Sequence, residues 1–296
     1  MNFALEIILL SVLLIIILTI YLNFKRIKDA IMGALLNKNA PCGKIKCDII
    51  EKDLPLPPSI TDYKKYSKEI GKYSMDLIGR IENSVEREDE INIPKGLVLD
   101  TVYNLGDKHK LLMILKEPSS KNNRIWIIFR GSKEYRDWME DFKVEFEEQF
   151  ESGVMIHKGF NDFFSVIKEK VTPTISKYKS KEIIVAGHSL GAALSTLFGL
   201  ELKRNDYNNI HVYNFGSPRI GNLKFKKLVD DTDIAIWRHV NTEDVIPTLP
   251  LPVTPDLEEP SNPFVYTHCG TVINFSTNWG SLVNNHTGAV YIDHFK

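Results

Sequence analysis

A single serine in this sequence has the surroundings of a catalytic nucleophile. The apolar run at residues 182–186 is followed at once by Gly-His-Ser-Leu-Gly at 187–191 and then by the helix-forming run AALSTLF. A strand, a G-x-S-x-G turn and a helix form a sharp, strained bend that lifts the serine, and the glycines leave room for close chain approach. The helix N-terminus also favours developing negative charge. We therefore predict Ser189 as the nucleophile; the alternative is an ordinary turn with a helix-capping serine.

A serine hydroxyl needs a histidine to take its proton and a carboxylate to orient that histidine. In chains with this strand, turn and helix, the order along the sequence is Ser, then Asp or Glu, then His. Asp244 follows the predicted strand at 234–240 and precedes Pro247. Because orienting acids lie in loops at strand ends, Asp244 is the predicted acid.

Several histidines are candidates for the base. His286 lies in the polar run NNHTG at 284–288, which we expect to be an exposed, mobile loop suited to a proton shuttle. His294, near the C-terminus, is its main competitor, whereas His239 and His268 are expected to be structural. Spacing favours His286 and leaves His294 open.

The elements that must position these residues alternate along the chain. An amphipathic helix is expected at 62–85, because large apolar residues recur there at spacings of three and four. Strands are predicted at 97–103, 111–116, 125–129, 155–157, 182–186, 211–215 and 234–240, and helices at 161–177, 190–204 and 221–229. Such alternation predicts a mostly parallel sheet covered by helices on both faces, with functional residues at the carboxyl ends of the strands.

Composition excludes some other functions. With 37 basic and 38 acidic side chains the net charge is -1, which gives no electrostatic basis for binding nucleic acid. Three cysteines do not make a disulfide framework, and the pair Cys42 and Cys47 lacks a second pair of ligands at zinc spacing. We predict no metal, no organic cofactor and no protein partner.

The N-terminal segment differs from the rest. Residues 4–22 are nearly all apolar, with one charge at Glu6, and are long enough to cross a bilayer as a helix. Because basic residues follow the run instead of preceding it, an uncleaved anchor with the bulk of the chain in the cytoplasm is expected. Two glycosylation-like sequons, at Asn274 and Asn285, leave a lumenal or secreted domain open. The expected organisation is an anchor at 1–28, a linker at 29–60 and one domain at 61–296.

From about residue 97 to 294 the chain resembles the class 3 lipases, a family of α/β-hydrolases that includes the fungal triacylglycerol lipases. The run GHSLGAAL at 187–194 is similar to the family's nucleophile motif, except that Ala192 stands where a third glycine is usual. Residues 241–250 resemble the family's acid loop and place its aspartate at Asp244. His286 with Tyr291 five residues later is similar to the family's C-terminal histidine motif. The resemblance implies an α/β-hydrolase fold and favours His286 as the base.

Further residues take roles from this resemblance alone. The run FRGS at 129–132 implies that Ser132 and the N–H of Leu190 form the oxyanion hole, which chemistry requires for the charged intermediate. The following segment resembles the family's lid, with Asp141 in the place of the residue that supports the oxyanion serine. Its apolar face is formed by Tyr135, Trp138, Met139 and Phe142. An ordinary amphipathic surface helix has the same spacing.

These observations predict hydrolysis of a lipid ester through an acyl-serine intermediate. The alternatives are a phospholipase or acyltransferase with the same triad, or an inactive, membrane-tethered lipase-like binding protein. From residue 133 to 151 there are eight carboxylates and three basic groups, which favours neutral acylglycerols over anionic phospholipids as substrates.

Overall fold

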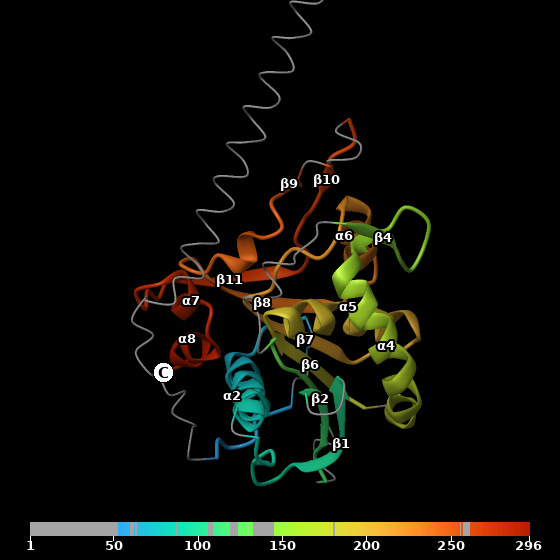
Figure 1. Ribbon diagram of the computed structural model, residues 1–296. Helices are drawn as coiled ribbons and strands as arrows, with labels where there is room; N and C mark the ends of the chain where they lie inside the picture. The colour runs from blue at the N-terminus through green and yellow to red at the C-terminus, as the bar shows by residue number, and fades with distance from the viewer. Residues whose placement is uncertain are drawn as a thin grey trace, which may run out of the picture. The chain divides into compact units, whose positions relative to one another are not determined.

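The computed structural model describes residues 53–59, 62, 64–86, 88–105, 109–118, 124–132, 145–179, 181–254, 256 and 261–296 (Figure 1). The predicted anchor at 1–28 and the predicted lid segment lie outside these residues. Over the ranges that the structure describes, we find no helix with the length and apolar character needed to span a bilayer.

A mixed sheet of seven strands is the centre of the fold. In spatial order its strands are β1 (Val98–Leu105), β2 (His109–Lys116), β3 (Ile125–Phe129), β6 (Ile183–His188), β7 (Ile210–Phe215), β8 (Ala235–Asn241) and β11 (Thr271–Phe275). The run from β3 to β11 is parallel, while β1 and β2 are antiparallel to their neighbours. Strands β3, β6 and β7 are buried at every position, which explains why they are continuous apolar runs.

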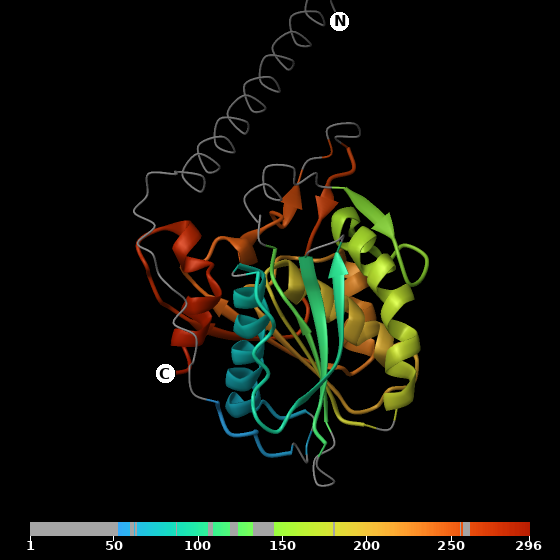
Figure 2. The same ribbon diagram turned by 60° about the horizontal axis from the view of Figure 1, so that its bottom comes forward.

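Helices cover both faces of this sheet, as the two views show (Figures 1 and 2). One face packs against α4 (Lys158–Ile175), α5 (Leu190–Arg204) and α6 (Leu223–Asp231), with Phe164, Phe198 and Phe225 in a single apolar cluster. The other face packs against α2 (Lys68–Glu86) and α8 (Gly288–Asp293), with Tyr73 and Tyr291 in a second cluster. The predicted mostly parallel, doubly covered sheet is confirmed.

Short elements decorate this frame. Strands β4 (Phe146–Glu148) and β5 (Met155–His157) pair with each other, as do β9 (Val253–Thr254) and β10 (Phe264–Val265). Single turns of helix are η1 (Ser176–Tyr178), η2 (Ile246–Thr248) and α7 (Leu282–Asn285). Because β3, β6, β7 and β8 are parallel, their carboxyl ends lie at one edge of the sheet, where the predicted site residues follow them.

Residues 53–59, at the end of the predicted linker, pack against the domain. Two buried arginines hold them: Arg80 Nη2 lies 3.2 Å from Asp53 Oδ1, and Arg124 Nη1 donates to the carbonyl of Pro58 at 2.9 Å. Arg124 also donates to the carbonyl of Pro57. The arginine side chains are 3% and 0% exposed. The folded unit therefore includes residues from 53 onward, which is earlier than the predicted start at 61.

Truncation tests this boundary. A chain that begins at residue 61 leaves Arg124 without the carbonyls that now accept its hydrogen bonds, whereas a chain that begins at residue 53 keeps them. We expect the shorter chain to lose roughly 3 kcal/mol in free energy of unfolding, because hydrogen bonds to charged groups contribute about 1.5–3 kcal/mol each. Urea unfolding of both chains measures the difference in free energy of unfolding. When Arg124→Met is introduced into both chains, this difference should become smaller. Equal unfolding midpoints for the two chains would contradict this assignment.

Candidate active site

Ser189 lies on a strained bend between β6 and α5. Its backbone has φ 56° and ψ -124°, a left-handed conformation that is rare for a residue with a side chain. The glycines beside it allow this bend: a Cβ on Gly187 would lie 2.1 Å from the carbonyl oxygen of Gly191, and one on Gly191 would lie 2.5 Å from that of Arg130. The elbow predicted from the sequence is therefore present, with backbone packed against backbone at both glycines.

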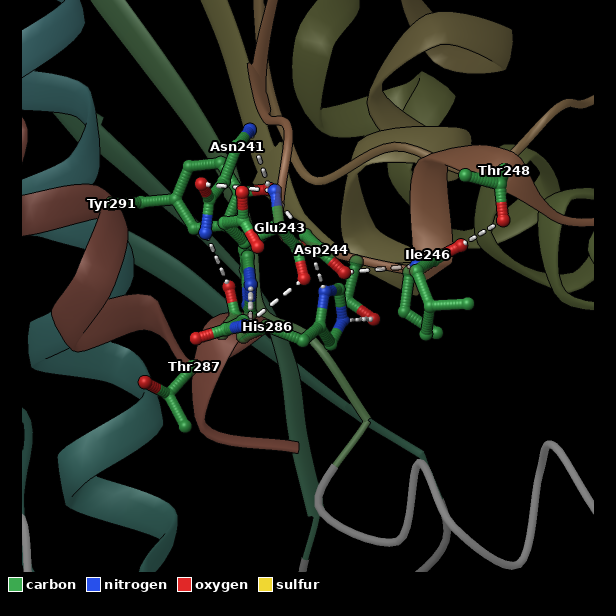
Figure 3. Close-up of polar contacts among 12 residues, drawn as sticks. Asn241, Glu243, Asp244, Ile246, Thr248, His286, Thr287 and Tyr291 are labelled. Atoms are coloured by element: carbon green, nitrogen blue, oxygen red, sulfur yellow. Dashed lines mark hydrogen bonds and ion pairs between the residues drawn. The ribbon is translucent and has the colours of Figure 1, made fainter. Parts of the chain in front are cut away.

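The side chains of the predicted triad are hydrogen-bonded in series. His286 Nε2 lies 2.7 Å from Ser189 Oγ. On the other side of the ring, His286 Nδ1 lies 2.7 Å from Asp244 Oδ2 (Figure 3). Ser189 is 2% exposed, while Asp244 and His286 are each 3% exposed. A carboxylate that accepts from Nδ1 leaves the Nε2 lone pair facing the hydroxyl, which is the tautomer a general base requires.

The carboxylate of Asp244 has two further donors. The backbone N–H of Ile246 donates to Oδ1 at 2.9 Å, and the hydroxyl of Tyr291 donates to Oδ2 at 2.6 Å. Burial and the adjacent charge of Asp244 raise the pKa of Tyr291 well above its ordinary value, so this hydroxyl keeps its proton and remains a donor. The donors fix the orientation of both carboxylate oxygens.

The segment that carries His286 is buried, which corrects the prediction of an exposed, mobile loop. Asn285 and His286 are each 3% exposed, and α7 ends directly before His286. The side-chain amide of Asn285 donates to the carbonyl of Glu243, and that of Asn241 donates to the carbonyl of Asn285. Polar side chains here satisfy buried backbone groups, and they join the acid loop to the histidine segment.

The other histidines that the sequence analysis considered lie elsewhere. His294 stacks on Phe275 with ring centroids 4.1 Å apart, and burial lowers its pKa. His239 lies 3.0 Å from the hydroxyl of Tyr66, and His268 bonds to a backbone carbonyl; burial lowers the pKa of each to about 3. Of the two candidate bases, His286 lies between Ser189 and Asp244, and His294 lies against Phe275.

Of the predicted oxyanion residues, Leu190 follows Ser189 in the chain, and Ser132 follows Gly131, which lies close to Ser189. Leu190 is the first residue of α5, so no helical carbonyl reaches its N–H. Ser132 follows β3, whose last residue, Phe129, is paired with Gly187 in the neighbouring strand. A Cβ on Gly131 would lie 3.3 Å from the Cβ of Ser189, which places this loop against the nucleophile. The lid residues Tyr135, Trp138, Met139 and Phe142, together with Asp141, lie outside the described residues.

Two residues that the sequence did not indicate also lie at the site. Glu82, on α2, has Oε1 3.0 Å from Nδ1 of His188, the residue before the nucleophile. The ring of His188 stacks on that of His286, with centroids 4.8 Å apart. More than a hundred residues separate Glu82 from His188 in the chain, and a glutamate on an amphipathic helix gives no signal of such a contact.

A substitution at Gly187 tests the close packing of the elbow. Because a Cβ there meets backbone atoms that cannot rotate away, we expect Gly187→Ala to lower the free energy of unfolding by about 1–3 kcal/mol and to abolish esterase activity. Ala192→Gly, at the position where the family usually has glycine, is the matched control and should cost no more than about 1 kcal/mol. Urea unfolding and ester hydrolysis measure both. A stable, active Gly187→Ala protein would refute the packing argument.

No grouping of three or more His, Cys, Asp or Glu side chains suited to a metal ion occurs in the residues that the structure describes. Cys269 is buried and reduced, while Cys42 and Cys47 lie outside those residues.

Comparison with known proteins agrees with this geometry. Residues 126–254 match the family model described as lipase (class 3). A lipase of Rhizomucor miehei is 34% identical over 147 residues, which cover 47% of this chain and 40% of that lipase. Phospholipase A1-IIgamma of Arabidopsis thaliana is 31% identical over 161 residues, which cover 43% of this chain and 38% of the relative. The chain thus spans less than half the length of these curated relatives.

A solved structure extends the likeness to most of the described domain. The triacylglyceride lipase of Rhizomucor miehei superimposes with a TM-score of 0.57 at 25% identity, covering 71% of this chain and 81% of that one. The shared architecture includes the α/β-hydrolase sheet and its helices. The matching family model and the triad in the order Ser, Asp, His make residues 126–254 of this chain similar to the class 3 lipases, with the same fold around them.

Proposed function

We propose that this protein is a serine hydrolase that cleaves carboxylic esters of lipids through an acyl intermediate on Ser189. The observation that carries the proposal is the continuous hydrogen-bonded series from Ser189 Oγ through the ring of His286 to Asp244, with both distances at 2.7 Å. The lipases and phospholipase A1 among its relatives support an ester of a lipid as the substrate.

The first half of the reaction forms the acyl enzyme. His286 Nε2 takes the proton from Ser189 Oγ as the oxygen attacks the ester carbonyl, and Asp244 stabilises the imidazolium through Nδ1. The N–H groups of Leu190 and Ser132 would donate hydrogen bonds to the negatively charged former carbonyl oxygen, each such donor lowering the barrier by about 2.7–4 kcal/mol. His286 then gives the proton to the leaving alcohol. In the second half, water takes the place of the alcohol and the same steps release the acid.

Neutral acylglycerols are the proposed substrates. The eight carboxylates between residues 133 and 151 oppose the approach of an anionic lipid surface. Because a phospholipase A1 is among the relatives, cleavage of a phospholipid is the second candidate. Rates on diacylglycerol and on phosphatidylcholine, presented in the same neutral micelles, distinguish the two.

A membrane location also belongs to this proposal. The apolar run at 4–22 would anchor the chain, with the hydrolase domain on the cytoplasmic side. The segment containing Trp138 and Phe142 would cover the site as a lid, turn its apolar side to lipid, and use Asp141 to support Ser132. Protease protection of the full-length chain in sealed vesicles tests this orientation. If the hydrolase domain is digested only by protease on the lumenal side, the domain lies on that side and the proposed orientation is wrong.

Labelling with a fluorophosphonate tests the proposed chemistry. This probe phosphonylates a serine only where a base activates the hydroxyl. We expect stoichiometric labelling of the full-length protein, with the adduct located on Ser189 by peptide mass spectrometry. Ser189→Ala should remain unlabelled, and His294→Ala should label like the wild type. Labelling that persists in Ser189→Ala would overturn the assignment.

A further inference from the structure

The pair formed by Glu82 and His188 takes no part in the triad, yet it contacts three segments of the active site. Glu82 Oε1 lies 3.0 Å from His188 Nδ1 and accepts a hydrogen bond from the N–H of Gly131 at 3.1 Å. On the other side of the ring, His188 Nε2 lies 2.9 Å from the carbonyl oxygen of His286. One carboxylate and one imidazole therefore connect α2 to three segments: the loop at 130–132, here called the oxyanion loop, the elbow at Ser189, and the segment that carries His286.

The hydrogen-bond partners define the charge of His188. A backbone carbonyl only accepts hydrogen bonds, and an ionised carboxylate does the same. With Glu82 ionised, each ring nitrogen of His188 faces a group that only accepts, so both nitrogens would carry a hydrogen and the ring would be an imidazolium. Glu82 Oε1 also receives the N–H of Gly131, which is the arrangement of an ionised carboxylate. The pair is partly buried, with the side chains of His188 and Glu82 7% and 21% exposed.

The charged surroundings agree with this protonation state. Burial would lower the pKa of His188, but the charge and hydrogen bond of Glu82, the charge of Asp244 and the carbonyl of His286 hold this pKa above its ordinary value. Burial would raise the pKa of Glu82, but His188, the N–H of Gly131 and the charge of Arg130 hold it below its ordinary value. The other groups facing the ring are the stacked imidazole of His286 and the ring of Tyr291, 5.5 Å away.

We propose that Glu82 and doubly protonated His188 form a positioning pair, which holds the backbone of His286 and the oxyanion loop in register with Ser189. This inference rests on the proposed hydrolase function. Neither residue touches the reacting atoms in this role; both act through the segments that they connect. Loss of one proton from His188 would set a lone pair against either the carboxylate of Glu82 or the carbonyl of His286. The His286 segment would then lose one of its attachments.

A defined pH dependence follows. A histidine whose pKa is raised in the folded protein contributes its stabilisation at low pH and loses it as the pH rises through that raised value. A carboxylate whose pKa is lowered contributes at higher pH and loses its contribution as the pH falls through the lowered value. The positioning pair is therefore complete between the lowered pKa of Glu82 and the raised pKa of His188, and the reactivity of Ser189 should fall on the alkaline side when His188 deprotonates.

The test compares Glu82→Gln with wild type in the full-length protein. Glutamine keeps the size of the side chain and an acceptor oxygen, but it removes the charge that keeps His188 protonated. The rate constant for fluorophosphonate labelling is measured from pH 5 to 10. We expect the alkaline fall in rate to move to lower pH by about one to three units, the range over which an opposite charge shifts a pKa. Near neutral pH the labelling rate constant of Glu82→Gln should be up to about 100-fold lower than that of wild type, because a small displacement of a catalytic group can cost that much in rate.

Controls separate a positioning role from a structural one. Glu69→Gln removes an exposed carboxylate from the first turn of the same helix and should reproduce the wild-type profile. In wild type, ¹⁵N shifts of histidine-labelled protein should show both His188 nitrogens protonated at pH 7, and in Glu82→Gln they should show a neutral ring. If the pH profile of Glu82→Gln is the same as that of wild type, or is lowered equally at every pH, the positioning pair is overturned. In that case labelling of wild type still supports the proposed hydrolase function. Absence of labelling in wild type removes the proposed function and this inference with it.

Discussion

His286→Ala is expected to lower kcat for ester hydrolysis by about 10⁴- to 10⁶-fold, because serine and base act as one unit and either loss removes the unit. In wild type the ring of His286 lies 2.7 Å from Ser189 Oγ. His239, His268 and His294 have their rings bonded or stacked elsewhere. His188 stacks on His286, but its two ring nitrogens lie against Glu82 and the carbonyl of His286 and not against Ser189. Initial rates on a soluble short-chain ester measure the loss.

Two controls accompany this substitution. His294→Ala removes the histidine that stacks on Phe275, and we expect its rate to stay within a few-fold of wild type. Added imidazole should restore part of the activity of His286→Ala, because the substitution leaves space between Ser189 and Asp244 for a free ring. If His294→Ala abolished hydrolysis and His286→Ala did not, the base would be assigned to the wrong histidine.

Asp244→Asn is expected to lower kcat by about 10⁴-fold with little change in substrate binding. The oxygen Oδ2 now accepts from His286 and Tyr291, while Oδ1 accepts from the N–H of Ile246. An asparagine that keeps its oxygen toward Ile246 turns its amide NH₂ toward His286. The ring then carries its hydrogen on Nε2, facing Ser189, and has no lone pair with which to take the serine proton.

The neighbouring carboxylate provides the matched control for Asp244→Asn. Glu243 lies in the same loop, and its side chain contacts Ser276 at the surface. We expect Glu243→Gln to retain wild-type kcat. The result that would refute the role of Asp244 is a similar, small effect of both substitutions on kcat.

The sequence predicted those parts of the site whose signals are local. The elbow at Ser189 was evident because the strand, the glycines and the helix are adjacent in the chain, and α5 has the predicted bounds. Asp244 was found from its place after a strand. The strands with continuous apolar runs, such as β3 and β7, were found for the same reason, because burial on both faces leaves a simple pattern.

Other features depend on contacts between distant segments. The edge strand β11 alternates exposed and half-buried residues and was not predicted, and residues 155–157 form a strand outside the main sheet. The sequence around His286 suggested an exposed loop because asparagine is usually a surface residue, yet Asn285 is buried by its hydrogen bonds. Glu82 was not found, because only the packing of α2 against β6 brings it to His188.

The most direct test of the account is the catalytic efficiency of wild type and Ser189→Ala on one neutral short-chain ester. If Ser189 forms the acyl intermediate, wild type should turn the ester over, and kcat/KM of Ser189→Ala should be lower by at least about 10⁴-fold. A Ser189→Ala protein that is as stable as wild type and retains kcat/KM within about tenfold would contradict the account, because hydrolysis would then proceed without the nucleophile that the elbow presents.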